Sequence, residues 1–274
     1  MKKLSDYDFL GSIYKNSKAS ELQETFESIK NQTHKPKNIF LVIDGYVEKN
    51  VLEIVEKYSF LLPLVLIPLK KNLGLGIALR KGLKKCESEI VLRFDTDDIN
   101  LEKRAELIVA ELDKGNVDIV GSNIYEFLDN PSILVSRKKM PLTHESICRT
   151  ILYRNPINHP SVGFFKKSIL KLQGGYRNFP FYEDYDLWIR ALFSGLKFKN
   201  IEEELVGLRI SNQRARRRGF KLIFSEFRLL FTFFNNSFLH GIFFIPSFLI
   251  RIIFALMPLK LVEFIFEKFL RNRP

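Results

Sequence analysis

Asp95, Asp97 and Asp98 are three carboxylates that directly follow the apolar segment 89–94. Carboxylates this close repel one another unless a cation or hydrogen bonds compensate them. Mg²⁺ and Mn²⁺ are commonly held by one or two carboxylates together with substrate phosphate oxygens, an arrangement that suits a diphosphate substrate. For an isolated Asp-x-Asp-Asp, a solvated turn that caps the next helix, over about 101–114, is the simpler interpretation. The position of this cluster at the end of a predicted buried strand favours the metal site.

A second acidic pair, Glu183-Asp184, begins a predicted helix over about 182–195. The helix macrodipole favours carboxylates in a first turn, so a structural role is the simpler interpretation. The functional alternative is a general base, because a carboxylate at such a position can accept the proton of an attacking hydroxyl. Trp188, the single Trp, lies four residues after Asp184 on the same predicted helix face, where it can stack on a sugar ring or pack in the core. Core packing is the simpler of these two roles.

Three further polar groups have both a structural and a functional interpretation. Asp44-Gly45 is an ordinary turn by composition, because Gly supplies a positive φ. Asn72-Leu-Gly-Leu-Gly resembles a phosphate-binding loop at a helix N-terminus, but it lacks a complete fingerprint, and a close-packed turn explains it equally well. His159, which precedes Pro160, could contact a metal or a phosphate, although a lone His is more often a hydrogen-bonded structural residue.

The elements that must position these residues are predicted from hydrophobic periodicity. Short apolar runs alternate with segments of helical period from residue 8 to about 120, which predicts an α/β fold with a largely parallel sheet and crossover helices. The predicted strands lie near 9–13, 38–43, 64–67, 89–94 and 118–121, and the first helix covers about 20–31 with Ser20 as its N-cap. Tyr14, Asp44, Asn72 and Asp95 all lie at or just after strand ends, where open α/β sheets bind ligands.

Charge and cysteine content limit the classes of partner and compartment. The 274-residue chain carries a formal charge of +12, which implies an anionic partner such as nucleic acid, anionic lipid or a diphosphate substrate. Cys86 and Cys148 are too few for a disulfide framework or a zinc site and suit a reducing compartment. The N-terminal segment has no apolar region ahead of its acidic residues, so we expect no secretory signal and a cytoplasmic catalytic region.

The composition changes near residues 212–220, after which Phe, Leu and Ile are abundant. We therefore expect a catalytic domain over 1–212 and a basic, Phe-rich helical region over 213–274 that associates with a membrane. The arginine run 214–218 could be solvated, bind nucleic acid, or contact anionic headgroups and diphosphates. The segment 238–258 is nearly long enough to cross a bilayer, but it is interrupted by His240, Gly241, Pro246 and Arg251, which favours interfacial or re-entrant helices. A helical subdomain packed on the catalytic domain and a homodimer interface are the alternatives.

An ordered series of short motifs extends over about residues 8–210. The motifs are Ser28-Ile-Lys-Asn-Gln-Thr, Leu41-Val-Ile-Asp-Gly, Asn72-Leu-Gly-Leu-Gly, Arg93-Phe-Asp-Thr-Asp-Asp, Arg104, Asn158-His-Pro-Ser-Val, Gly174-Gly-Tyr and Glu183-Asp-Tyr-Asp-Leu-Trp. Each motif is weak by itself, but the series resembles the family 2 inverting glycosyltransferases of GT-A fold. Within that family it is most similar to bacterial enzymes that build exopolysaccharide, capsule or lipopolysaccharide. The resemblance implies a Rossmann-like mixed sheet.

The resemblance also implies roles for individual residues. The donor site would consist of Tyr14, Asp44, Asn72, Arg80 and Asp95, with Asp44 at the nucleotide base. Asp97, together with Asp95, would hold the Mn²⁺ or Mg²⁺ that bridges the diphosphate. Asp184 would be the catalytic base beside Glu183, and the acceptor would be bordered by Trp188, Asp186 and His159. Two positions depart from the family pattern: Ser12-Ile-Tyr14-Lys15 stands in place of Pro-x-Tyr-Asn, and Arg80 stands where Asn is frequent.

The reaction implied by the resemblance is a single displacement, in which a base-activated hydroxyl attacks the anomeric carbon and inverts its configuration. The expected donor is a nucleoside-diphosphate sugar, with a UDP-sugar favoured, and the expected acceptor is a lipid-linked saccharide at the cytoplasmic face of the cell membrane. A metal-dependent nucleotidyltransferase is the nearer alternative, but the loop 14–20 has no Gly with which to hold a triphosphate. A nucleic-acid-binding protein would explain the charge only. The oligomeric state is left open.

Overall fold

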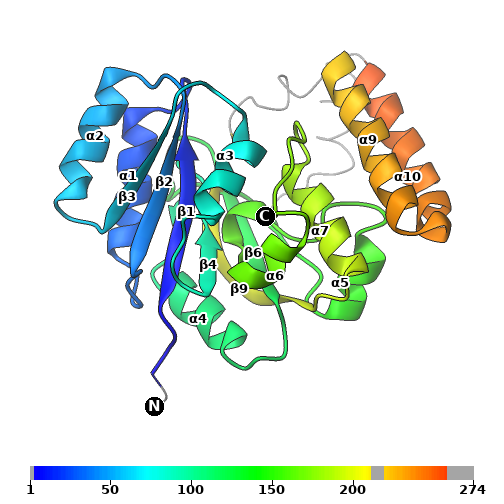
Figure 1. Cartoon of the computed structure of the whole chain (residues 1–274), viewed down its shortest axis with the longest axis horizontal. Helices are drawn as coiled ribbons and strands as arrows, with labels where there is room; N and C mark the ends of the chain where they lie inside the picture. Colours follow the sequence, from blue (N-terminus) through cyan, green and yellow to red (C-terminus); the bar gives the residue numbers. More distant parts are fainter. Residues whose placement is uncertain (1–2, 211–218, 258–274) are drawn as a thin grey trace.

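The centre of the fold is a nine-stranded mixed sheet with helices on both faces (Figure 1). The computed structural model describes residues 3–210 and 219–257. The strands are β1 Tyr7–Ile13, β2 Asn38–Asp44, β3 Leu64–Leu69, β4 Ile90–Arg93, β5 Ile99–Asn100, β6 Ile119–Phe127, β7 Leu134–Lys138, β8 Gly163–Phe165 and β9 Phe198–Arg209. Their order across the sheet is β3-β2-β1-β4-β8-β6-β9-β5, and β7 pairs with β6.

The helices form two layers because successive strand residues point to opposite faces of the sheet. Their bounds are α1 Ala19–Lys30, α2 Lys49–Ser59, α3 Leu75–Leu83, α4 Arg104–Leu112, α5 His144–Thr150, the 3₁₀ helix η1 His159–Ser161, α6 Lys166–Lys171, α7 Glu183–Phe193, α9 Phe220–Asn236 and α10 Phe238–Leu256. In β2, Ile39 and Leu41 belong to the core that α1, α2 and α4 cover. Phe40 and Val42 belong to the second core, which contains buried residues of α3, α7, α9 and α10.

The parallel half of the sheet confirms the expected α/β alternation. β3, β2, β1 and β4 are parallel neighbours, so their carboxyl ends meet at one edge of the sheet. The other half is mixed, because β8 runs antiparallel to both β4 and β6. The predicted cap of the first helix is wrong: α1 begins at Ala19, its N-cap is Lys18, and Ser20 lies inside the helix. The strand expected at 118–121 continues to Phe127, because it pairs with β9 over this length.

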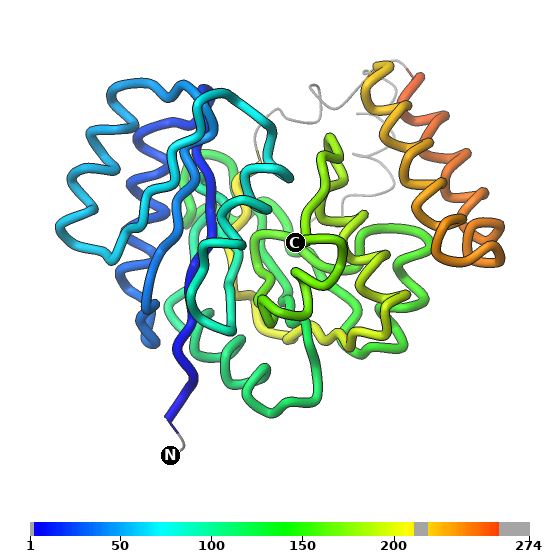
Figure 2. The backbone as a smooth tube through the Cα atoms, viewed as in Figure 1, coloured from blue at the N-terminus to red at the C-terminus, as the bar shows by residue number. Residues whose placement is uncertain are grey.

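α9 and α10 form an antiparallel helical hairpin at the opposite end of the molecule from α2 (Figures 1 and 2). The residues that interrupt the apolar run do not interrupt the helix, since α10 continues through Gly241, Pro246 and Arg251. Leu229, Phe233, Phe244 and Phe248 of this hairpin belong to the same hydrophobic core as α7, so the hairpin packs on the catalytic region. The domain boundary at 212/213 and the arginine run 214–218 lie outside the described residues.

Among the described helices, α10 is the one that is long and apolar enough to cross a membrane by length and composition alone. It has 19 residues, and its most apolar window has a mean hydropathy of 2.0 and is 28% buried against the rest of the protein. Most of this window is therefore not buried, and about half of the residues of α10 are exposed, among them Phe243, Ile250 and Ile253.

Candidate active site

The parallel strand ends and the start of α7 enclose a cavity of about 800 Å³. Eight of the residues predicted from the sequence line it: Tyr14, Asp44, Asn72, Asp95, Asp97, His159, Glu183 and Asp184. Three predicted residues, Arg80, Asp186 and Trp188, do not. The cavity therefore brings the acidic cluster after β4 and the acidic pair of α7 together as two walls of one space.

Asp44, the last residue of β2, organises the loop before α3. Its carboxylate accepts hydrogen bonds from the backbone N–H of Leu73 at 2.7 Å and of Gly74 at 2.9 Å, and the side chain of Asn72 donates to the Asp44 carbonyl at 3.1 Å. Gly45 has the expected positive φ of 80°, and a Cβ there would lie 2.4 Å from the backbone nitrogen of Asn72. The close-packed turn is therefore the right interpretation of this loop, because these two N–H groups bond to Asp44 and do not point freely at a phosphate.

Asp95 is held by a buried guanidinium from the strand that precedes it. Arg93, the last residue of β4, forms an ion pair with the Asp95 carboxylate and also donates to the carbonyl of Leu10 on the neighbouring strand β1 at 3.4 Å. Arg104 of α4 donates in turn to the Arg93 carbonyl. The position of Asp95 is thus fixed from inside the sheet.

Asp97 and Asp98 are adjacent in sequence but occupy different environments. Burial, followed by the nearby charges of Asp95 and Glu21, raises the pKa of Asp97 to about 7. Asp98 turns toward the interior, where its carboxylate accepts a hydrogen bond from the backbone N–H of Arg209 at 2.8 Å, and burial raises its pKa well above the usual range. Asp97 therefore lines the cavity as a carboxyl group whose negative charge is not balanced by nearby positive charge. Asp98 instead anchors the loop through its hydrogen bond with Arg209.

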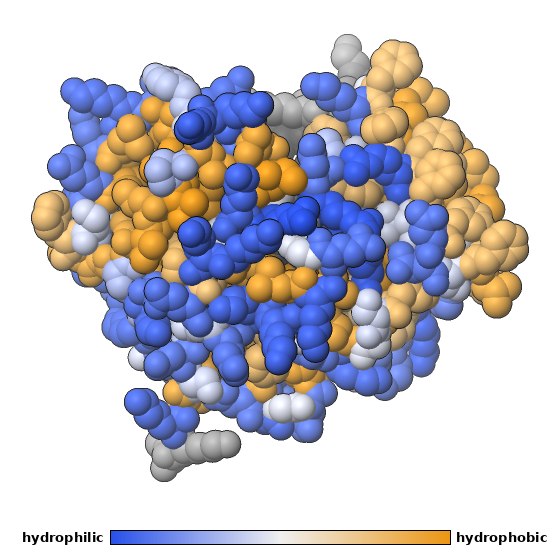
Figure 3. Space-filling view, in the orientation of Figure 1, coloured by the Kyte–Doolittle hydropathy of each residue, from blue (hydrophilic) through white to orange (hydrophobic). Residues whose placement is uncertain are grey.

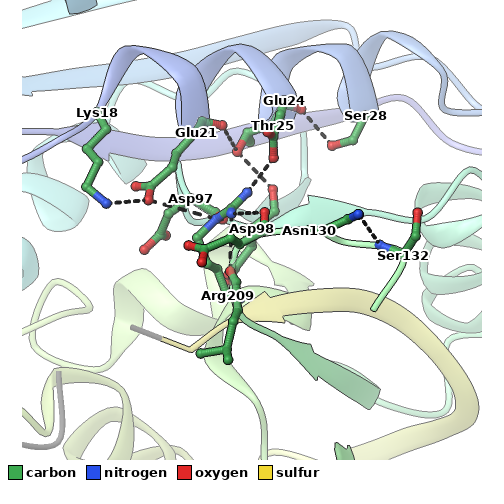
Figure 4. Close-up of polar contacts among 12 residues, drawn as sticks. Lys18, Glu21, Glu24, Thr25, Ser28, Asp97, Asp98, Asn130, Ser132 and Arg209 are labelled. Carbon is green, nitrogen blue, oxygen red and sulfur yellow. Dashed lines mark hydrogen bonds and ion pairs between the residues drawn. The ribbon is translucent and has the colours of Figure 1, made fainter. Parts of the chain in front are cut away.

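Arg209, at the end of β9, is the main residue of this wall that sequence reasoning missed (Figure 4). Its Nε donates to the carbonyl of Asp97 at 2.9 Å, its Nη1 donates to the carbonyl of Asp129 at 2.9 Å, and its Nη2 pairs with Glu24 of α1. The guanidinium also lies 4.6 Å from the centroid of the Phe127 ring. No short-range pattern signals this role, because Arg209 and Asp97 are 112 residues apart in the chain.

The acidic loop suits a divalent cation whose ligands come partly from the protein and partly from the substrate. Within residues 3–210 and 219–257, no group of three or more His, Cys, Asp and Glu side chains is placed to hold a metal by itself. Asp95 and Asp97 offer carboxylate oxygens, which Mg²⁺ and Mn²⁺ prefer, and these ions usually take further ligands from water and substrate phosphates. A cation beside Asp97 would also offset the burial and the nearby negative charges that together raise its pKa.

The opposite wall is formed by the first turn of α7 and by η1. The Asp184 carboxylate accepts hydrogen bonds from the side-chain amide of Asn155 at 2.6 Å and from the backbone N–H of Tyr185 at 2.7 Å. His159 is hydrogen-bonded to the hydroxyl of Tyr176 at 3.0 Å, and burial lowers the pKa of its imidazole to about 4. His159 is therefore neutral at pH 7 and bonded to the protein interior, which agrees with the structural interpretation of this residue.

The model of the family described as "Glycosyl transferase family 2" matches residues 12–172 of this chain. The chain belongs to glycosyl transferase family 2. Among curated proteins, this glycosyltransferase is 34% identical over 267 residues to the amylovoran biosynthesis glycosyltransferase AmsE of Erwinia amylovora, covering 96% of this chain and 98% of that protein. It is also 34% identical over 268 residues to the UDP-Gal:alpha-D-GlcNAc-diphosphoundecaprenol beta-1,3-galactosyltransferase of Escherichia coli, covering 97% of each chain.

Solved structures confirm the GT-A-like fold of the glycosyltransferase. The crystal structure of residues 1–349 of Staphylococcus aureus TarS in complex with UDP-GlcNAc superposes with a TM-score of 0.70. The match has 17% sequence identity and covers 90% of this chain and 72% of that chain. Family membership favours sugar transfer over the nucleotidyl-transfer and nucleic-acid-binding alternatives.

Three predicted site residues of the glycosyltransferase have other places in the structure. Trp188 is 0% exposed and packs edge-on to His159 and Phe198, so it is a core residue and not a platform for the acceptor. Trp188 follows Asp184 by about one helical turn, and its contact with Phe198 places it where α7 packs against β9. The guanidinium of Arg80 lies against the turn at Gly174, where an added Cβ would be 2.8 Å from its Nη2.

Asp186 is likewise a structural residue and not a contact for the acceptor. It is 0% exposed, and its carboxylate accepts hydrogen bonds from Arg190 Nε at 2.9 Å and from the Thr232 hydroxyl at 3.1 Å. Because Thr232 belongs to α9, this contact ties the hairpin to α7. Sequence reasoning missed it because the first turn of a helix exposes some carboxylates and buries others, and only the packing of α9 decides which.

Proposed function

We propose that this glycosyltransferase is an inverting, metal-dependent enzyme that transfers a sugar from a nucleoside-diphosphate donor to a lipid-linked saccharide in surface polysaccharide biosynthesis. The observation that carries the proposal is the shared cavity, in which Asp95 and Asp97 form one wall and Glu183 and Asp184 form the other. A UDP-sugar is the favoured donor, since the E. coli relative is named for UDP-Gal and the TarS structure contains UDP-GlcNAc. The name of the same relative, which includes diphosphoundecaprenol, supports a lipid-linked acceptor.

The donor would bind along the strand ends, with its base near Tyr14 and Asp44 and its diphosphate near Asp95 and Asp97. When bound, Mg²⁺ or Mn²⁺ neutralises charge on the departing nucleoside diphosphate. Asp97 and Asp95 are the protein ligands available for this ion. The buried Arg93 keeps the Asp95 carboxylate in place for this role.

Asp184 would accept the proton of the acceptor hydroxyl as its oxygen attacks the anomeric carbon. The new carbon–oxygen bond forms on the face opposite the bond to phosphate, which breaks, so the configuration inverts and the nucleoside diphosphate leaves with the bonding electrons. The hydrogen bonds from Asn155 and from the Tyr185 N–H fix the orientation of the Asp184 carboxylate. An α-linked donor would give a β-linked product.

The α9–α10 hairpin would attach the enzyme to the cytoplasmic face of the membrane. Figure 3 shows apolar side chains gathered over this hairpin, and exposed members include Phe224, Phe231, Phe243, Ile250 and Ile253. Ser247, in the middle of α10, donates to the Tyr153 carbonyl of the catalytic region at 3.0 Å. A helix held along the protein at its midpoint lies on the membrane surface more readily than it crosses the bilayer, which supports interfacial attachment.

The proposal is tested with purified full-length protein, a panel of nucleotide-sugars, and acceptors that carry a sugar on a diphosphate-linked lipid. The expected result is transfer from one UDP-sugar, loss of transfer with EDTA, recovery with Mn²⁺ or Mg²⁺, and a β-linkage in the NMR spectrum of the product. An α-linked product from an α-linked donor would refute inversion, and full activity in EDTA would refute the metal requirement.

A further inference from the structure

Arg251 of α10 reaches the wall of the cavity that carries the proposed catalytic base. Its side chain is 19% exposed, and it lines the cavity together with Glu183 and Asp184, although it comes from the otherwise apolar second helix of the hairpin. A charged arginine in an apolar helix costs free energy unless it faces protein or water, and such residues commonly belong to a functional site. The inward position of Arg251 is therefore a candidate functional feature.

The protein holds the Arg251 guanidinium in a defined place. Its Nη2 donates to the carbonyl of Tyr153 at 3.1 Å, and its Nη1 lies 3.6 Å from a carboxylate oxygen of Glu226 on α9. The charge lies 5.3 Å from the ring centroid of Tyr185 and 5.7 Å from that of Tyr182, the residues on either side of the acidic pair. A guanidinium held in this way is pre-organised to bind an anion.

The charges around the cavity show where a bound anion would need a compensating cation. Eight acidic residues line it: Glu21, Asp44, Asp95, Asp97, Asp98, Glu126, Glu183 and Asp184. Four cations line it as well: Lys18 pairs with Glu21, Arg209 pairs with Glu24, Arg251 pairs with Glu226, and Lys138 is the last residue of β7. A substrate with a phosphate near Glu183 and Asp184 would be repelled by these carboxylates, and Arg251 is the guanidinium placed beside them to offset this.

The surface next to Arg251 indicates where this phosphate comes from. Ile250 and Ile253, which lie within one helical turn of Arg251, are 56% and 57% exposed on the apolar face of the hairpin. We propose that Arg251 binds the phosphate that links the acceptor sugar to its lipid. The sugar hydroxyl then reaches Asp184 while the lipid lies along the apolar face. This inference rests on the proposed lipid-linked acceptor and assigns the residue that recognises it.

The test compares two acceptors that carry the same sugar, one through a diphosphate to an alkyl chain and one as a simple alkyl glycoside. In Arg251→Gln we expect KM for the diphosphate acceptor to rise about 10- to 100-fold with little change in kcat, because a charged hydrogen bond made equally in ground and transition states is lost. KM for the alkyl glycoside changes little, so the preference for the diphosphate acceptor disappears. Arg251→Lys keeps part of this preference, since it retains the charge.

Arg228→Gln is the matched control. Arg228 belongs to the same hairpin, donates to the Asn178 carbonyl at 2.9 Å and lies 4.4 Å from the Phe179 ring centroid, but it does not line the cavity. The proposal would be overturned if Arg251→Gln lost activity equally with both acceptors and either Arg228→Gln lost as much or the melting temperature of Arg251→Gln fell. Such a result would mean that Arg251 has a structural role. Wild-type enzyme that uses both acceptors equally well would overturn the proposal while leaving sugar transfer intact. Transfer to neither acceptor would instead refute the proposed acceptor class, and this inference with it.

Discussion

The two walls of the cavity are built in different ways. The proposed donor wall consists of Asp44, Asp95 and Asp97, which lie at or shortly after the end of a parallel strand and are each fixed by backbone N–H groups or by a guanidinium. The proposed acceptor wall is the start of α7 with η1 and the α9–α10 hairpin, and its polar side chains are held by contacts between helices and loops, such as those of Asp184 with Asn155 and of Arg251 with Tyr153. The positions of the carboxylates in the donor wall therefore depend mainly on where the parallel strands end. The positions of the side chains in the acceptor wall depend mainly on how the helices pack.

The largest expected effects come from removing one carboxylate from each wall. Asp97→Ala and Asp184→Asn should each lower the rate of sugar transfer by about 10²- to 10⁴-fold, the usual contribution of a metal ligand or a general base. They should differ in binding: Asp97→Ala weakens Mn²⁺-dependent affinity for the nucleotide, whereas Asp184→Asn keeps it, because the amide is isosteric and lies across the cavity. Rates and calorimetric affinities measured together check this. Activity near that of the wild type in either variant would remove that residue from its proposed role.

Asp186→Ala probes the acceptor wall from inside. The change leaves the buried Arg190 without the carboxylate that it contacts at 2.8 Å and removes the link to Thr232, so we expect a loss of about 3–5 kcal/mol in the free energy of unfolding. Urea unfolding measures this loss. The milder control Thr232→Val removes only the hydroxyl, for which about 1 kcal/mol is expected. If Asp186→Ala were as stable as the wild type but had a higher KM for the acceptor, the earlier acceptor-binding interpretation of Asp186 would be right.

The difference between the walls also explains what could be predicted from the sequence. That Asp44, Asp95 and Asp97 line one cavity could be predicted because apolar runs mark the strands and parallel strands bring their carboxyl ends to one edge. The register of β1 with β2 and β4 then places their carboxyl ends side by side, with no information needed from the second half of the chain.

The acceptor wall was predicted less well, because its geometry depends on contacts between distant segments. Helical spacing predicted that Trp188 and Asp184 share one face of the helix, but it could not predict that Trp188 is fully buried against Phe198 of β9. Arg251 of this wall and Arg209 of the donor wall were missed as site residues for the same reason, since their partners lie up to 98 and 185 residues away in the chain. The continuity of α10 through Pro246 also follows from packing on α9 and α7, which overrides a local helix-breaking signal.

The exposed face of the hairpin can be tested without disturbing its packed face. Phe231→Glu combined with Phe243→Glu places two charges where the side chains are 60% and 62% exposed, so the fold should persist. Each Phe removed from the membrane interface costs about 1.5–3 kcal/mol of binding, so partitioning onto anionic vesicles should fall by 10-fold or more. Phe60→Glu is the control, because Phe60 is 84% exposed next to α2 at the other end of the molecule. Equal effects of both changes, or none, would exclude the hairpin as the membrane contact.

The smallest expected effect concerns His159 of η1, which lines the cavity and is hydrogen-bonded to the buried hydroxyl of Tyr176. Its pKa of about 4 lies below the ordinary value of about 6.5. At a pH about one unit or more above 6.5 the imidazole is neutral in both states and adds no pH dependence. As the pH falls below 6.5, the unfolded chain takes up a proton that the folded protein does not, so stability is lost, by about 2 kcal/mol at pH 5. The raised pKa of Asp97 acts in the opposite direction, because the folded protein then binds the extra proton.

The measurement is the change in the free energy of unfolding between pH 7 and pH 5 in the wild type and in His159→Gln. The contribution of Asp97 is the same in both proteins, so it cancels in the comparison. The same pH dependence in both proteins would mean that His159 is protonated in the folded state and free to act as an acid at the acceptor wall.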